Sequence, residues 1–110
     1  MVLVEKEGNI DVVHFLNDRI NALNVGTIKK TVIPLLEQQN NRIIIDLEGI
    51  NYIDSTGFAM FLQLMRTAKI NYCTLKLCSM SQSILDLFST LQLQTTFDLY
   101  TDRGTCLNSF

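Results

Sequence analysis

The chain has one proline, one histidine and no tryptophan, and these shortages exclude several classes of protein. A single proline among 110 residues leaves no proline-rich linker or low-complexity segment. His14 and the three cysteines do not follow any metal-ligand spacing, and no glycine-rich phosphate loop occurs. We therefore expect no metal and no other cofactor, a structural role for His14, and three free thiols in a reducing compartment.

Concentrated positive charge is also missing. Nine basic and eleven acidic residues leave a net charge of −2, and the longest basic cluster is the pair Lys29 and Lys30. Nucleic-acid binding requires a concentrated basic surface, so we expect no nucleic-acid partner.

Long apolar runs are absent as well. No run approaches the ~20 residues that span a bilayer, and the charge at Glu5 interrupts any signal-peptide core. We expect a cytoplasmic protein with no membrane partner.

The composition is that of a globular domain. Hydrophobic residues make up 47% of the chain and charged residues 18%. A domain typically has ~100–150 residues, so we expect a single domain over residues 1–110.

The apolar pattern predicts alternating strands and helices. Runs at 2–5 and 10–15 flank a turn and predict an antiparallel hairpin. Apolar residues at three- and four-residue steps after Asn24 predict a helix capped by Asn24, with a kink or an early end at Pro34 and with the polar run 38–41 closing the segment. The remaining expected elements are a strand over 42–47, a loop over 48–54, a helix from Ser55 to about Ile70, a strand over 74–78, a helix capped by Ser79 with Gln82, a strand over 97–100 and a short helix within 102–110.

This order predicts an α/β fold. Helices that alternate with single strands indicate βαβ units and one mainly parallel sheet, preceded here by the antiparallel hairpin. The strands alternate apolar and polar residues, whereas parallel strands covered on both faces read as continuous apolar runs. We expect sequential strand order, with the main helices packed on one face and the other face largely polar.

The segment Asp54-Ser55-Thr56-Gly57 carries the most chemical information. It follows a strand and a loop and begins an apolar helix. A serine at this place can serve only as a helix N-cap, or it can accept a phosphate, because helix N-termini favour anions. Asp54 either caps the helix or positions Ser55, and Thr56 is a second hydroxyl. Gly57 either eases the approach of a partner or is simply tolerated in the first helical turn.

The order of strand, seven-residue loop, Asp-Ser-Thr-Gly and apolar helix resembles the STAS family, of the bacterial anti-sigma-factor antagonist type. The segment Arg19-Ile20-Asn21-Ala22-Leu23 is a second, weaker match, with Asn21 where family members often have an acidic residue. The resemblance implies a STAS fold and a non-enzymatic phosphoprotein that regulates transcription by partner switching.

The resemblance also implies the site and its partners. Ser55 is the phosphate acceptor, supported by Asp54, Thr56 and Gly57. The unphosphorylated form binds an anti-sigma factor that is also a serine kinase and so frees the sigma factor, and a phosphatase of the PP2C type resets the switch.

Two residues of the helix after Ser55 are interpreted as a docking surface. Met60 and Leu64 lie off the apolar stripe, so we expect them to be exposed on the same helix as Ser55. Together with Asn21, they are the residues expected to contact the partner. Packing against a neighbouring helix is the alternative. The other functions we considered are a STAS module in a lipid-transport or signalling complex, without phosphorylation, and a small enzyme, which the missing catalytic set disfavours.

Overall fold

Five strands form one mixed sheet in the computed structural model, which describes residues 2–110. They lie in the order β1 (Val2–Glu7), β2 (Ile10–Phe15), β4 (Arg42–Asp46), β6 (Thr74–Cys78) and β7 (Asp98–Tyr100). The first pair is antiparallel and the other three pairs are parallel. The predicted hairpin, sequential order and mainly parallel sheet are confirmed.

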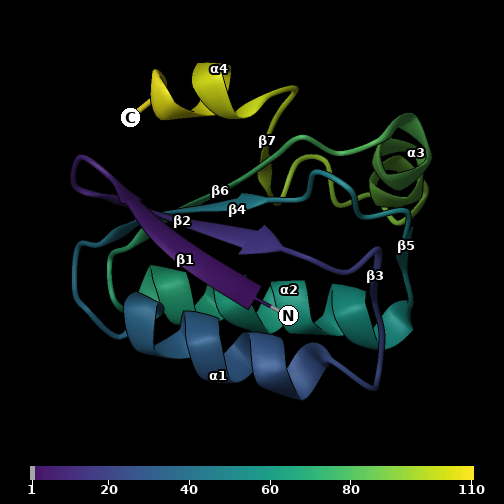
Figure 1. Cartoon of the computed structure of the whole chain (residues 1–110), viewed down its shortest axis with the longest axis horizontal. Helices are drawn as coiled ribbons and strands as arrows, with labels where there is room; N and C mark the ends of the chain where they lie inside the picture. The colour runs from purple at the N-terminus through teal and green to yellow at the C-terminus, as the bar shows by residue number, and fades with distance from the viewer. Residues whose placement is uncertain (1) are drawn as a thin grey trace.

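Helices α1 (Val25–Leu36) and α2 (Ser55–Ile70) cover one face of this sheet (Figure 1). Helix α3 (Gln82–Thr90) lies at one end of the molecule and joins the same core. The predicted position of the main helices is confirmed for α1 and α2. Four phenylalanines from α2, α3 and the segment before β7 pack edge to face or tilted: Phe58, Phe61, Phe88 and Phe97.

The opposite face of the sheet is less polar than expected. Helix α4 (Arg103–Leu107) lies over it, and Val12, Ile44, Cys78 and Cys106 form a second, small apolar cluster with exposed fractions of zero. The alternation of polar and apolar residues misled the prediction here, because these strands have apolar residues on both faces at the sheet centre. The short helix predicted in the tail is confirmed.

Two segments expected to be irregular form a second, two-stranded sheet. Strand β3 (Arg19–Ile20) pairs in parallel with β5 (Tyr52–Ile53). Two-residue strands have no readable period, so the sequence offered no signal for them. This pairing brings the loop before α1 to the start of α2.

Pro34 lies inside α1 and does not end the helix. The helix continues to Leu36, and the N–H of Glu37 still bonds to the carbonyl of Ile33 at 3.0 Å. Buried Val32 and Leu36 hold this last turn against the core, which offsets the hydrogen bond that proline removes.

The N-terminal boundary of α3 differs from the prediction. Ser81, not Ser79, caps the helix, since its hydroxyl accepts the N–H of Ile84. Ser79 has φ 63° and its N–H bonds to the carbonyl of Tyr100, so the chain turns there before the helix begins.

The expected exposure of Met60 and Leu64 is wrong. Their exposed fractions are 3% and 0%, and both belong to the main core. The sequence predicted a single buried stripe, made of Phe58, Phe61, Leu62, Met65 and Ala68. Helix α2 packs against both the sheet and α1, so it buries a wider arc of its surface than this stripe. Leu62 is instead 38% exposed.

Leu64→Ala and Leu62→Ala therefore form a matched pair that tests this burial. Leu64→Ala is expected to lower the free energy of unfolding by ~2–5 kcal/mol, because it leaves a cavity in the core. Leu62→Ala removes the same atoms from a partly exposed site and should cost less than ~1 kcal/mol. Urea unfolding measures both, and equal losses would contradict the burial described here.

Candidate functional site

The carboxylate of Asp54 caps helix α2. Its Oδ1 accepts the N–H of Gly57 at 3.0 Å and the hydroxyl of Thr56. The N-cap is thus Asp54, and Ser55 is the first residue of the helix, so the expectation that Ser55 itself caps the helix is wrong. Aspartate is as good a cap as serine, and its charge also complements the positive end of the helix dipole.

Ser55 is exposed at the start of α2. Within residues 2–110 its hydroxyl makes no hydrogen bond, whereas the neighbouring hydroxyl of Thr56 donates to Asp54. Of the two hydroxyls in the motif, that of Ser55 is therefore the one without a structural role in the cap. This geometry agrees with the choice of Ser55 over Thr56 as the candidate phosphate acceptor.

The loop between β3 and α1 lies against the start of α2, and we call the two segments together the Ser55 corner. The second carboxylate oxygen of Asp54 accepts the N–H of Ala22 at 3.3 Å, and the N–H of Asp54 bonds to the carbonyl of Ile20. Asn21 orders this loop, since its side-chain oxygen accepts the N–H of Leu23 at 3.0 Å. The two segments that carry the family resemblance are therefore joined by hydrogen bonds across 32 positions of sequence.

Leu23 is a surface residue that the sequence reading did not single out. It is 93% exposed, in a turn that Asn21 holds in place beside Ala22. Asn24, expected as the cap of α1, occupies the cap position, but its side chain accepts from the N–H of Asn21 and donates to the carbonyl of Arg19. It stabilises the turn rather than the helix.

Gly57 points into the protein rather than toward a partner. A Cβ atom there would lie 2.6 Å from Cγ2 of Ile53 and 3.0 Å from Cγ2 of Ile20. The absence of a side chain lets the first turn of α2 lie directly on the β3–β5 pair. The structure therefore gives Gly57 a packing role that neither interpretation from the sequence included.

Hydrogen bonding also sets the charge of the corner. The Thr56 hydroxyl, with the N–H groups of Gly57 and Ala22, lowers the pKa of the Asp54 carboxyl below its usual value. Asp54 is therefore ionised at neutral pH, directly before the Ser55 hydroxyl.

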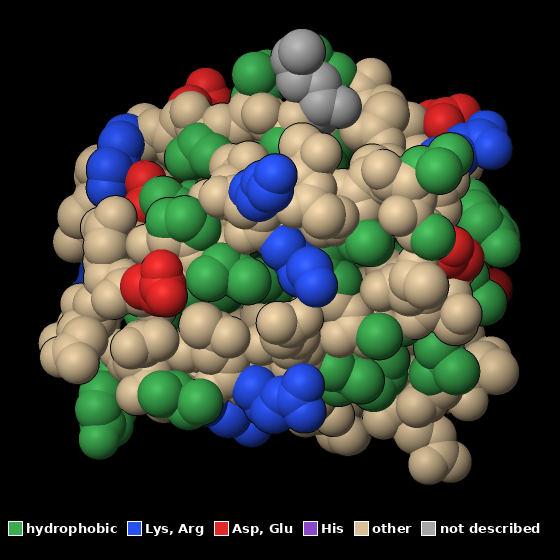
Figure 2. All heavy atoms as spheres, turned by 90° about the horizontal axis from the view of Figure 1, so that it is seen from below, with side chains coloured by type: hydrophobic (Ala, Val, Ile, Leu, Met, Phe, Trp, Pro, Cys, Tyr) green, Lys and Arg blue, Asp and Glu red, His purple; other side chains and the backbone are tan. Residues whose placement is uncertain are grey.

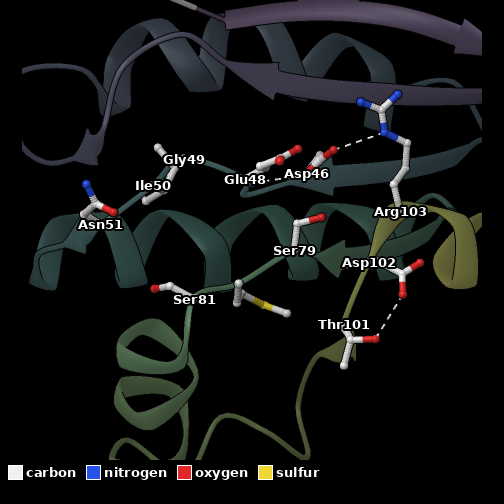
Figure 3. A pocket seen from close by; sticks show the side chains of 11 residues that line it. Asp46, Glu48, Gly49, Ile50, Asn51, Ser79, Ser81, Thr101, Asp102 and Arg103 are labelled. Carbon is white, nitrogen blue, oxygen red and sulfur yellow. Dashed lines mark hydrogen bonds and ion pairs between the residues drawn. The ribbon is translucent and has the colours of Figure 1, made fainter.

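A concavity lies at the carboxyl ends of β4 and β6, and its lining includes Asp46, Ser79, Ser81 and Arg103 (Figure 3). Asp46 is 2% exposed, and its oxygens accept the N–H of Glu48 and the Nε of Arg103. Arg103 also donates to Glu5 and contacts His14, so this histidine lies within the hydrogen-bond network between α4 and the sheet. Arg103 is thus paired with two carboxylates, and these ion pairs tie α4 to the sheet.

Comparison with known proteins agrees with this fold. The family model of the STAS domain matches residues 1–106, and the chain belongs to this family. The anti-sigma-B factor antagonist of Bacillus subtilis (strain 168) is 28% identical over 98 residues, covering 83% of this chain and 89% of that protein.

Solved structures show the same arrangement. An anti-sigma-factor antagonist (STAS) domain protein from Planctomyces limnophilus superposes with a TM-score of 0.89 at 20% identity, covering 98% of this chain and 96% of that one. The unphosphorylated form of the Bacillus anti-sigma factor antagonist SpoIIAA has a TM-score of 0.81 at 17% identity, covering 99% and 95%. None of the helices within residues 2–110 combines the length and apolar content that crossing a bilayer requires.

Gly57→Ala is expected to destabilise the protein by ~1–3 kcal/mol, because the new methyl group overlaps Ile53. Gly26→Ala is the matched control, since a Cβ at Gly26 meets nothing within 4 Å. There the gain in helix propensity should raise stability by ~0.5–1 kcal/mol. Thermal unfolding of both variants measures the difference, and a stabilising Gly57→Ala would refute the proposed packing.

Asp54→Asn keeps a capping oxygen and removes the charge, so it isolates the ionic part of the cap. Because the pKa of Asp54 is lower in the folded state than in the unfolded state, its ionisation stabilises the protein at pH values above the unfolded-state pKa of ~3.9. This stabilisation is lost as the pH falls through the folded-state pKa. The difference in unfolding free energy between wild type and variant should therefore be constant near neutrality and shrink below about pH 4. Urea titrations across this range provide the measurement, and a difference that grows on acidification would contradict it.

Proposed function

We propose that this protein is an anti-sigma-factor antagonist whose switch is Ser55. In its unphosphorylated form it binds an anti-sigma factor that is also a serine kinase, and binding releases the sigma factor. Phosphorylation of Ser55 ends the binding, and a PP2C-type phosphatase reverses it. The chain acts as a cytoplasmic binding module without catalytic groups or a cofactor of its own, and ATP and magnesium come with the kinase.

The exposed Ser55 hydroxyl is the observation that carries this proposal. It has no hydrogen bond in the described chain and stands at the end of a helix that the core holds rigidly. A kinase can reach it without unfolding any element. Membership of the STAS family and the similarity to the Bacillus subtilis antagonist support the assignment of partner.

The surroundings of Ser55 explain how a phosphate would act. The N–H of Gly57 is already used by Asp54, and the ionised carboxylate faces the positive end of the helix. A phosphate adds about −1.5 to −2 charges beside this carboxylate. Unpaired charge at a desolvated interface costs several kcal/mol, and about 1.4 kcal/mol changes affinity tenfold. Modification thus alters the binding surface and leaves the fold in place.

Leu23 supplies an apolar contact for the partner beside the switch. Met60 and Leu64 are buried, so they are not available for docking. Leu23 is exposed on the loop that is hydrogen-bonded to Asp54, and Asn21 presents it. Because a partner can bury an exposed apolar side chain on a hydrogen-bonded loop at little ordering cost, we place Leu23 in the contact and Asn21 as the residue that orients it.

A second candidate function is a STAS module in a larger complex, where Ser55 is never modified. Its support is that the fold also matches a segment of the murine anion transporter Slc26a9, with a TM-score of 0.71 at 12% identity, covering 91% of this chain and 17% of that one. Intact-mass analysis of the protein from its native cells separates the two functions.

Ser55 variants test the switch directly. Ser55→Ala should keep its stability within ~0.5 kcal/mol, because the hydroxyl is not part of the cap, and should bind the anti-sigma factor but accept no phosphate. Ser55→Asp should fold normally and bind about tenfold more weakly, on the order of 1.4 kcal/mol. Calorimetric titration and phosphate incorporation with the anti-sigma kinase of the same organism are the measurements.

Thr56→Ala is the matched control for the neighbouring hydroxyl. It should be phosphorylated normally, with some loss of stability because Thr56 donates to Asp54. Stoichiometric phosphorylation of Ser55→Ala would show that another residue is the acceptor. Equal affinities of wild type and Ser55→Asp would show that charge at this position does not control binding.

A further inference from the structure

Charge is divided unequally between the helices that cover the sheet and the rest of the chain. Helices α1 and α2 contain Lys29, Lys30, Arg66 and Lys69 and no acidic residue. All eleven acidic residues and the other five basic ones lie elsewhere. Figure 2 views this helical face, with basic side chains across its middle and acidic ones toward its edges.

The four helical cations have no counter-ions of their own. Within residues 2–110 none of them takes part in an ion pair, whereas Lys6, Arg19 and Arg103 are each paired with a carboxylate. Lys29 donates only to the neutral side chain of Gln63, at 3.3 Å. Unpaired cations on one face of a protein with net charge −2 favour an anionic partner at that face.

A shallow apolar hollow lies between two of these cations. Its volume is about 540 Å³, and its lining residues are Gly26, Lys29, Lys30, Ile33 and Pro34, all from α1. They follow the i, i+3, i+4, i+7, i+8 spacing of one helix face. Gly26 leaves one end open, since nothing lies within 4 Å of a Cβ built there.

We propose that this hollow binds an amphipathic helix of a partner protein, with an apolar side chain in the hollow and carboxylates beside Lys29 and Lys30. A helix in a groove makes these two kinds of contact together. A lipid surface fits less well, because helices that insert into a bilayer interface present a row of large apolar side chains, and the apolar side chains here are only the half-buried Ile33 and the exposed Pro34. The site is separate from Ser55 and extends the proposed function to a second contact surface.

The test uses two synthetic helical peptides of about 18 residues, long enough to form helix, with the same leucine face. One has glutamate and the other lysine on its flanks. In NMR titrations of the whole protein, the glutamate peptide should shift the amide signals of Gly26, Lys30 and Ile33 and bind about tenfold or more tightly than the lysine peptide.

Variants of the hollow make the test specific. Gly26→Phe should fill the hollow and abolish binding, while Gly26→Ala should keep it. Lys30→Glu should weaken binding of the glutamate peptide about tenfold, and Arg42→Glu, the same charge change on an exposed residue of β4, should have no effect. If Gly26→Phe does not fold, the Lys30 and Arg42 variants still decide the outcome.

Three results would overturn the proposal: equal affinity for both peptides, signal shifts confined to residues outside α1, or binding of phosphatidylglycerol vesicles through α1 in place of either peptide. Ser55→Asp should leave peptide affinity unchanged. If phosphorylation of Ser55 does not control partner binding but the glutamate peptide still binds, only the proposed function is refuted. If the switch works and the peptide does not bind, only this inference is refuted.

Discussion

The position of Ser55 depends on one carboxylate, that of Asp54. It caps α2 through Gly57, holds the Thr56 hydroxyl, and bonds to the N–H of Ala22 in a distant loop. A single ionised group therefore closes the helix end and joins two segments of the surface. Because charge-assisted hydrogen bonds are about twice as strong as neutral ones, this arrangement makes the corner rigid without covering the Ser55 hydroxyl.

Packing beneath the corner imposes a matching constraint. Gly57 lies directly on Ile20 and Ile53, so the first turn of α2 cannot move without opening the β3–β5 pair. Further along the helix, Phe58 packs edge to face on Phe88 at 5.2 Å between ring centroids. The helix is held on two sides over most of its length, and its accessible chemistry is concentrated at its N-terminus and in the adjoining loop.

The same packing separates charges on the surface. On the α4 side of the sheet, Arg103 is bonded to Asp46 and Glu5, and Lys76 lies over the ring of Phe110. Those charges stabilise the contact of α4 with the sheet. Helices α1 and α2 instead bury apolar residues and leave Lys30, Arg66 and Lys69 exposed, while Lys29 is half-buried beside Gln63.

Much of the fold was predictable from local patterns. Three-residue and four-residue periodicity located α1 and α2, and β-branched runs located β2 and β4. Alternation with helices then implied sequential order in a mainly parallel sheet. The motif at the start of α2 was recognisable because its residues are consecutive. Boundaries that depend on a single turn were less accessible, as at Ser79, where a positive φ delays α3 by two residues.

By itself, the sequence determined which of the longer elements form, their order and the place of Ser55 at a helix start, because these depend on contacts between residues near each other in the chain. Only the tertiary structure decided that Asp54 is the cap, that Gly57 is buried, and that Met60 and Leu64 belong to the core. How wide an arc of a helix is buried depends on how many neighbours it has, and α2 has both the sheet and α1. The place of Leu23 beside the start of α2 likewise depends on a hydrogen bond between residues 22 and 54, which no local pattern contains.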